Sequence, residues 1–265
     1  MIWEVVKANK KSFLVGTAHF FPYSFRTSLS RFIKNASTVL LEGPLDQESM
    51  ARVVEAGCQK EKEGHLFEEL DEKTVNEITE ALVPFSRRRD LLSICNIGSF
   101  REENPVYGMI KGMKPWMAFF RLWTAFLERQ GWRYSVDLDA YRIAVEMNKA
   151  VVFLETIEEQ IEVLEGLSYE RILDFLRRVG RWHDYARGYA KAYLAGDMER
   201  LKSNSIGFPS RHHNVIDRRD QILFERMLTY LKQGDAVVCV GAPHIRGIGP
   251  MLQTTGYRIQ GLFNH

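Results

Sequence analysis

Two histidines at opposite ends of the chain follow the same small turn, and both have side chains that could do chemistry. His19 closes the segment "FLVGTAH" and His244 closes "VCVGAPH", so each follows an apolar run at Gly-x-x-His spacing. Gly16 and Gly241 permit a tight turn that directs the histidine back over the end of a strand. A neutral imidazole can bind a first-row metal ion or act as a general base.

Two glutamates also stand at the ends of apolar, β-branched segments. Glu42 follows "VLL" and Glu155 follows "VFL". In open α/β sheets, functional side chains gather at the carboxyl ends of the strands, so we expect these glutamates to converge with His19 and His244. Two imidazoles and two carboxylates form a suitable ligand set for a divalent metal ion.

The alternative for each of these residues is structural. A lone histidine at a strand end is more often hydrogen-bonded within the protein than a ligand, and Gly-x-x-His is short enough to arise by chance. Two copies in matching contexts, with two glutamates, favour a shared site. The sequence has no HExxH, CxxC pair, P-loop, complete GxGxxG or GxSxG, which argues against several common enzyme classes.

The elements that must position these residues are strands drawn from distant parts of the chain. Two helical regions, about 47–132 and 157–233, separate them. We expect one α/β domain over residues 1–265, with a central mainly mixed sheet, pseudo-symmetric halves, and the helical regions packed on the sheet or capping it. The expected strands are 2–8, 11–18, 37–45, 149–156, 235–244 and 256–263.

Composition is that of an ordinary globular protein. Hydrophobic residues make up 45% and charged residues 26%, and the formal net charge is +2, so nothing global points to nucleic acid. There is no apolar run long enough to span a membrane, and the first residues do not resemble a signal peptide. Three widely spaced cysteines are typical of reduced thiols, and we expect a cytoplasmic location.

The segments "FLVGTAH", "STVLLEGPLD", "LETIEEQ" and "VVCVGAPHIRGIGP" together resemble the TraB/GumN family, which is similar to the TIKI metalloproteases. The resemblance covers nearly the whole chain in the same order. It implies an α/β fold with two pseudo-symmetric halves and, for the TIKI branch, metal-dependent peptide hydrolysis with manganese or cobalt. The matching residues are His19, Glu42, Asp137, Glu155, Gln160, Arg219 and His244.

One departure concerns Arg219, which the family follows with asparagine, whereas this chain has Asp220. Arg219 could bind a substrate carboxylate or stabilise an oxyanion, and the alternative is a salt bridge to a neighbouring helix. Gln160 could instead bridge backbone groups, and Asp137 could instead cap the helix that starts near Leu138.

The mechanism that we expect places a divalent ion on both histidines and one glutamate. The resemblance implies manganese or cobalt as the ion, and zinc is also compatible with these ligands. The ion would activate a water for attack on a peptide, with the other glutamate as general base. The rival hypothesis is a non-catalytic ligand-binding or signalling protein on the same scaffold. A third is an esterase-like hydrolase that uses a histidine as base without a metal.

Two other segments are open to a functional interpretation. "RHHN" (211–214) offers adjacent histidines and could lie over the site as a lid, although a surface loop is the simpler interpretation. Trp116, Phe119, Phe120 and Trp123 recur at helical spacing, which is more typical of a core than of a binding platform.

Overall fold

A computed structural model describes residues 1–58, 66–83, 104–211 and 213–262. The strands are β1 (Ile2–Lys7), β2 (Lys10–Thr17), β3 (Thr38–Leu41), β4 (Ala150–Phe153), β5 (Ala236–Gly241) and β6 (Arg258–Gly261).

Helices occupy most of the remaining described chain. They are α1 (Arg26–Ile33), α2 (Gln47–Gly57), η1 (Leu66–Glu69), α3 (Glu72–Leu82), α6 (Pro105–Ile110), α7 (Pro115–Arg129), α8 (Val136–Glu146), α9 (Ile157–Glu165), α10 (Tyr169–Leu176), η2 (Val179–Arg181), α11 (Trp182–Ala195), α12 (Met198–Ser205), η3 (Pro209–Arg211), α13 (His213–Gln233), η4 (Ala242–His244) and α14 (Ile245–Thr254).

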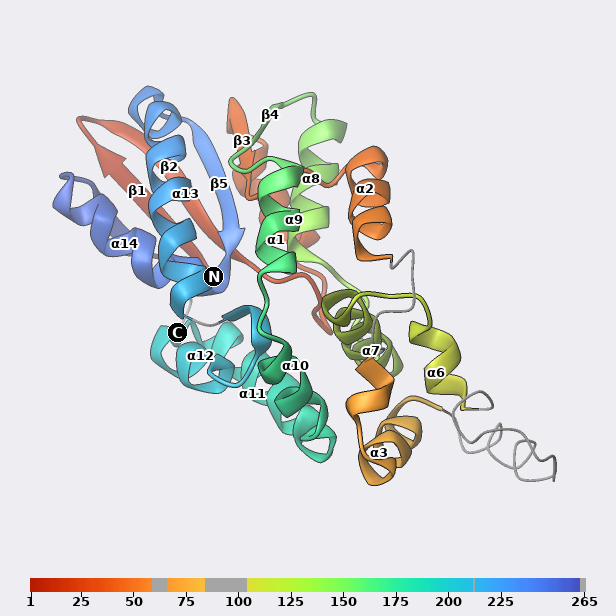
Figure 1. Ribbon diagram of the computed structural model, residues 1–265. Helices are drawn as coiled ribbons and strands as arrows, with labels where there is room; N and C mark the ends of the chain where they lie inside the picture. Colours follow the sequence, from red (N-terminus) through yellow and green to blue (C-terminus); the bar gives the residue numbers. More distant parts are fainter. Residues whose placement is uncertain (59–65, 84–103, 212, 263–265) are drawn as a thin grey trace.

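The sheet brings the two ends of the chain and its middle together, as the sequence predicts. Its order is β4-β3-β5-β2-β1-β6, with β4, β3, β5 and β2 parallel and with β1 antiparallel to both of its neighbours. Figure 1 shows the red N-terminal strands beside the blue strand β5. The α/β fold with a mixed central sheet is therefore confirmed.

The two Gly-x-x-His units repeat locally but lead to different places. From β2 the chain passes through α1 to β3, which lies on the far side of β5. From β5 it passes through η4 and α14 to β6, which lies on the far side of β2 and β1. Each unit therefore crosses strands of the other, and this interleaving puts β2 and β5 next to each other at the centre of the sheet.

The hairpin between β1 and β2 shows why a short turn suffices there. Ala8 and Asn9 both have positive φ, at 48° and 60°, which is the backbone twist of a two-residue hairpin loop. The register pairs Lys7 with Lys10 and Ile2 with Val15. Because β2 pairs with β5 in parallel and Thr17 lies opposite Gly241, the two strands end at the same edge of the sheet.

Alternation along the strands gives the sheet two buried faces. Val39 and Val237 belong to one core, which includes residues of α1 and α8. Leu40 and Val238 belong to the other, which includes residues of α13 and α14. Burying a side chain of this size contributes about 1.5–3 kcal/mol, so both helical layers are held mainly by these contacts. The arrangement is a three-layer α/β sandwich.

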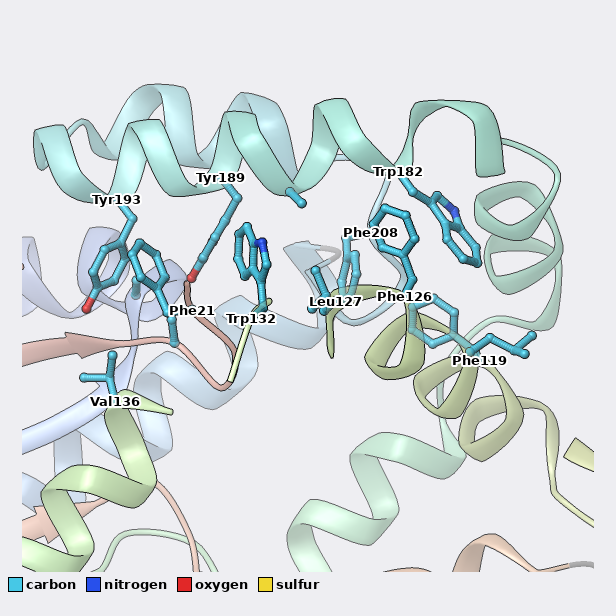
Figure 2. Close-up of a cluster of buried hydrophobic side chains, with 14 of the residues drawn as sticks. Phe21, Phe119, Phe126, Leu127, Trp132, Val136, Trp182, Tyr189, Tyr193 and Phe208 are labelled. Carbon is cyan, nitrogen blue, oxygen red and sulfur yellow. The ribbon is translucent and has the colours of Figure 1, made fainter. Parts of the chain in front are cut away.

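The helical regions extend the first core away from the sheet. Phe119, Phe126 and Trp182 are almost completely buried and their rings contact neighbouring aromatic rings, as Figure 2 shows. Trp116 is buried as well, so the core interpretation of the aromatic residues of α7 is confirmed. None of the helices in the described ranges combines the length and the apolar character that a membrane crossing needs.

No named strand lies in the described parts of the two regions predicted to be helical. Residues 59–65 and 84–103 of the first region lie outside the described residues. The prediction of a single domain over the whole chain stays a prediction.

Candidate active site

The carboxyl ends of four parallel strands meet at one edge of the sheet, and the predicted site residues follow them. Glu42 comes directly after β3, and Glu155 follows the end of the neighbouring strand β4 by two residues. The Glu155 amide donates to the Glu42 carbonyl at 2.8 Å, which continues the strand pairing and places the two carboxylates side by side. His244 ends η4, directly after β5.

Arg219 of α13 bridges the two glutamates. Its Nε donates to Glu155 Oε1 at 2.8 Å and its Nη2 donates to Glu155 Oε2 at 2.6 Å. The same Nη2 also donates to Glu42 Oε1. Side-chain exposure is 14% for Arg219, 14% for Glu42 and 3% for Glu155, so this is a buried ion-pair cluster with two carboxylates on one guanidinium.

Glu42 is held in its ionised form. Burial opposes its ionisation, but Arg219, His244 and the Gly241 amide outweigh burial and lower the pKa of Glu42 to about 2. The Gly241 amide donates to Glu42 Oε2 at 2.7 Å. A carboxylate with so low a pKa is a poor general base near neutral pH, whereas it remains a good anionic ligand.

His244 is positioned by a residue for which the sequence predicts no role. Its Nδ1 lies 2.6 Å from Asp220 Oδ1, and both side chains are buried. Asp220 fits because residue 247 is glycine: a Cβ there would lie 1.8 Å from Asp220 Oδ2. The Nε2 atom of His244 is on the side of Glu42 and lies 3.9 Å from Glu42 Oε1.

Asp220 carried one signal in the sequence, its departure from the asparagine of the family. Its contact with His244 joins the middle of α13 to the end of η4 across 24 residues, and no local pattern indicates such a contact. Burial raises the pKa of Asp220, and the hydrogen bond to His244 opposes that effect.

His19 has a matching carboxylate partner. Its Nδ1 lies 3.1 Å from Asp137 Oδ2, and Asp137 Oδ1 accepts a hydrogen bond from Thr17. Asp137 raises the pKa of His19 to about 9. Asp137 is itself only 5% exposed, whereas the His19 side chain is 73% exposed and open to solvent.

The capping role considered for Asp137 is wrong. The residue that caps α8 is Ser135, whose side chain accepts a hydrogen bond from the Leu138 amide. Asp137 lies within the first turn of α8 and reaches the end of β2 through Thr17 and His19. The Asp137 side chain thus contacts the turn that contains His19 and does not cap its own helix.

The glycines of both turns allow close packing, because a Cβ at either position would make a tight contact. A Cβ on Gly16 would lie 3.3 Å from the Ala242 Cα, and one on Gly241 would lie 3.1 Å from Glu42 Oε2. Tyr193 of α11 donates to the Gly16 carbonyl at 2.6 Å, which fixes the first turn from the helical layer. Figure 2 shows Tyr193 and Tyr189 pointing from α11 toward Phe21.

Gln160 does not join the ion-pair cluster directly. Its amide packs over the backbone of Gly43, where a Cβ would lie 2.0 Å from Gln160 Nε2. It therefore covers the residue after Glu42.

Arg226, one of the residues that hold α9 to α13, donates to both oxygens of Glu159 at 2.7 Å.

The donor types fit a divalent ion, although the ligands are not fully assembled. Within the described ranges, no group of three or more His, Cys, Asp or Glu side chains could hold a metal ion. Two ligands of one tetrahedral ion at ~2.1 Å lie roughly 3.4 Å apart, and the 3.9 Å from His244 Nε2 to Glu42 Oε1 approaches that value. A carboxylate behind the second nitrogen of each histidine is the usual support of a metal ligand. The exposed ring of His19 is the donor that would have to turn toward Glu42.

The "RHHN" segment is only partly described. His212 lies outside the described residues, as do the side chains of His213 and Asn214, so the lid hypothesis for these histidines lies outside them too. Arg211 is described and ends η3.

Comparison of the chain with curated proteins finds no match, and comparison with solved structures finds none either. The model of the TraB/PrgY/gumN family matches residues 1–261, which is nearly the whole length and includes both Gly-x-x-His turns, both glutamates and Arg219. The chain belongs to the TraB/PrgY/gumN family.

Proposed function

We propose that this protein is a metal-dependent hydrolase and that its substrates are peptides. The observation that carries the proposal is the pair of histidine–carboxylate contacts, His19 with Asp137 and His244 with Asp220, at one sheet edge. Asp220 is hydrogen-bonded to Nδ1 of His244, and Asp137 Oδ2 lies 3.1 Å from Nδ1 of His19, so in both pairs the carboxylate is beside Nδ1 and Nε2 is left for another partner. The relation of the family to the TIKI metalloproteases, which implies peptide hydrolysis, stays a prediction.

In this proposal His19, His244 and Glu42 are the residues that would hold the ion. A bound manganese, cobalt or zinc ion supplies a water of lowered pKa and a Lewis acid for the scissile carbonyl. Glu42 suits the ligand role because it stays ionised at neutral pH and lies beside His244 Nε2. Asp137 and Asp220 orient the two imidazoles.

Arg219 and Glu155 have a linked role. Glu155 engages two nitrogens of the guanidinium and so fixes its orientation next to Glu42. A guanidinium held in that position can stabilise negative charge that develops on the substrate oxygen. The general-base role predicted for one glutamate stays a prediction, and Glu42 is the less suitable of the two because of its low pKa.

The proposal is tested with a mixture of fluorogenic peptides after the protein has been stripped with EDTA. We expect hydrolysis only after manganese, cobalt or zinc is restored, and we expect the His244→Ala variant to lose it. His183→Ala is the matched control, because His183 is exposed and its ring contacts Phe126 in the helical layer. Absence of hydrolysis with every ion would contradict the proposal and favour a non-catalytic binding protein.

One observation favours a second candidate, a hydrolase without a metal. The 2.6 Å contact between His244 and buried Asp220 is the arrangement that makes a histidine an effective general base. Hydrolysis that continues undiminished in EDTA and is lost in His244→Ala would identify this mechanism instead.

A further inference from the structure

The backbone on either side of Glu155 is bound by one pair of side chains. Leu154 precedes Glu155, and its carbonyl accepts a hydrogen bond from Arg226 Nη1 at 2.6 Å. Thr156 follows Glu155, and its amide donates to Glu159 Oε2 at 2.8 Å. Arg226 and Glu159 therefore hold the two backbone groups between which Glu155 lies. We call Arg226 and Glu159 the clamp.

The two clamp residues are also bonded to each other. Arg226 Nη1 donates to Glu159 Oε2 and Arg226 Nη2 donates to Glu159 Oε1, both at 2.7 Å. The nitrogen that binds the Leu154 carbonyl is thus bonded to the oxygen that binds the Thr156 amide, and these three bonds form a closed path around Glu155. The hydrogen bonds from Arg226 and from the Thr156 amide lower the pKa of Glu159 to about 2, so its carboxylate is charged at neutral pH.

Capping of α9 explains only part of this arrangement. Thr156 and Glu159 form a capping box, in which each side chain accepts a hydrogen bond from the backbone amide of the other residue. That motif needs no arginine. Arg226 comes from α13, 67 residues further along the chain than Glu159, and it binds the Leu154 carbonyl, which lies outside the helix. The clamp therefore joins α13 to the end of β4 as well as closing the first turn of α9.

The same helix carries the arginine that Glu155 orients. Arg219 and Arg226 are seven residues apart in α13, which is close to two turns, so they lie on one face of the helix. Arg219 binds the Glu155 carboxylate through Nε at 2.8 Å and through Nη2 at 2.6 Å. The clamp therefore fixes both the backbone from which Glu155 projects and the helix from which Arg219 projects. A contact of two parallel bonds depends on the alignment of both partners, so it is sensitive to movement of either one.

We propose that Arg226 and Glu159 are positioning residues, which hold Glu155 so that its carboxylate orients the Arg219 guanidinium. The inference rests on the proposed function, in which this guanidinium stabilises negative charge on the substrate oxygen. The clamp acts from outside the buried cluster, since its side chains are 42% and 35% exposed whereas that of Glu155 is 3% exposed. It can therefore be altered while Arg219, Glu42 and Glu155 are all retained.

The first test measures kcat and KM separately for the fluorogenic peptides, with the ion that gives the wild type its highest rate. Arg226→Met should lower kcat about tenfold or more and change KM by less than about twofold, because a misplaced guanidinium loses an interaction that belongs to the transition state. Arg52→Met is the matched control and should keep both wild-type values. Arg52 pairs with Glu158, on the same turn of α9 as Glu159, and the paired side chains are 50% and 60% exposed.

Arg226→Lys is the conservative variant. Lysine retains the positive charge and can donate to the Leu154 carbonyl or to Glu159, but it lacks the planar fork that binds both at once. Its kcat should lie between those of the wild type and Arg226→Met, and it carries the comparison if Arg226→Met does not fold. A kcat of Arg226→Met equal to that of Arg52→Met would overturn the inference.

Hydrogen exchange of the Arg219 Nε–H group, followed by NMR, tests the positioning without any activity. This group donates to Glu155 Oε1, and its signal is assigned by its absence from the spectrum of Arg219→Lys. The buried indole N–H of Trp182, which donates to the Phe175 carbonyl at 3.1 Å, is the reference for general loosening of the fold. In Arg226→Met the exchange at Arg219 should become about tenfold or more faster relative to that at Trp182. An equal acceleration at both groups would mean a purely structural role and would overturn the inference.

The two readouts separate this inference from the hydrolase proposal. If no peptide is cleaved but exchange at Arg219 is selectively faster in Arg226→Met, the clamp stands and the hydrolase proposal fails. If peptides are cleaved and Arg226→Met changes neither kcat nor the exchange, the clamp is wrong and the hydrolase proposal survives. Faster exchange with an unchanged kcat would also overturn the inference, because the position of Arg219 would then not matter to the reaction.

Discussion

Replacing Arg219 with methionine should destabilise the protein far more than removing a comparable surface arginine. Arg219→Met leaves Glu155, with 3% side-chain exposure, and Glu42, with 14%, without their shared cation. Removing one partner of a buried ion pair costs about 3–5 kcal/mol, because the remaining charge stays desolvated. We expect a loss of that size in the free energy of unfolding, measured by urea denaturation in EDTA.

Arg226→Met is the matched control. Arg226 lies two helical turns along α13 and forms a similar fork with Glu159, but the two side chains are 42% and 35% exposed. A solvated pair of this kind contributes about 1 kcal/mol or less. Arg226 also donates to the Leu154 carbonyl at 2.6 Å, so the difference between the two variants gives a lower bound on the effect of burial.

The effect of Arg219→Met should also depend on pH. In the wild type the folded-state pKa of Glu42 is about 2, below its unfolded value, so its contribution is present above about pH 4.5 and is lost as pH falls toward 2. Without Arg219, burial should raise the pKa of Glu42. Protonation of Glu42 at low pH then removes the free-energy cost of a buried, unpaired charge in the variant. The gap in unfolding free energy between wild type and Arg219→Met should therefore narrow from pH 7 to pH 4.

Either of two results would refute this reasoning. One is an Arg219→Met variant that is no less stable than Arg226→Met at pH 7. The other is a gap between wild type and Arg219→Met that does not change with pH. Both would mean that the two carboxylates find other compensation in the folded protein.

Three further changes test how the two turns are held. Asp220→Asn should weaken metal affinity about tenfold or more, because it removes the anionic partner of His244 Nδ1; unchanged affinity in a metal titration would count against the orienting role. Gly247→Ala should have a similar effect on metal affinity, since its Cβ would lie 1.8 Å from Asp220 Oδ2, and an affinity equal to that of the wild type would show that Asp220 can move at no cost. Tyr193→Phe should lower the unfolding free energy by about 0.5–1.5 kcal/mol through loss of the 2.6 Å bond to the Gly16 carbonyl, and a variant as stable as wild type would exclude that contribution.

The fold was predictable because short local sequence patterns mark its strands. Apolar, β-branched runs that end in glycine and a polar residue mark β2, β3 and β5, and their carboxyl ends do meet at one edge. The order of the strands was not predictable, since it depends on which helices cross which strands. That order decides that β3 and not β6 lies beside β5.

For the site, the sequence predicts which residues lie near one another but not which side-chain contacts they form. The sequence predicts that His19, Glu42, Glu155 and His244 share an edge. In the structure Arg219 joins Glu42 to Glu155, and His244 lies 3.9 Å from Glu42, whereas the contact described for His19 is with Asp137. The bridge formed by Arg219 and the support of His244 by Asp220 are side-chain contacts between α13 and the strand ends. They depend on how far α13 is rotated about its own axis. A pattern of apolar residues indicates only which face of the helix is buried and does not determine that rotation accurately enough to predict side-chain contacts.

The central claim is that the two Gly-x-x-His turns serve one divalent ion, and the metal content of the protein tests it most directly. The wild-type protein, the His19→Ala/His244→Ala double variant and the His183→Ala control are each incubated with manganese, cobalt or zinc, desalted and measured by elemental analysis. We predict close to one ion per chain in the wild type and the control, and loss of the ion in the double variant. A wild-type protein that stays metal-free, or a double variant that retains the same ion content, would contradict the claim.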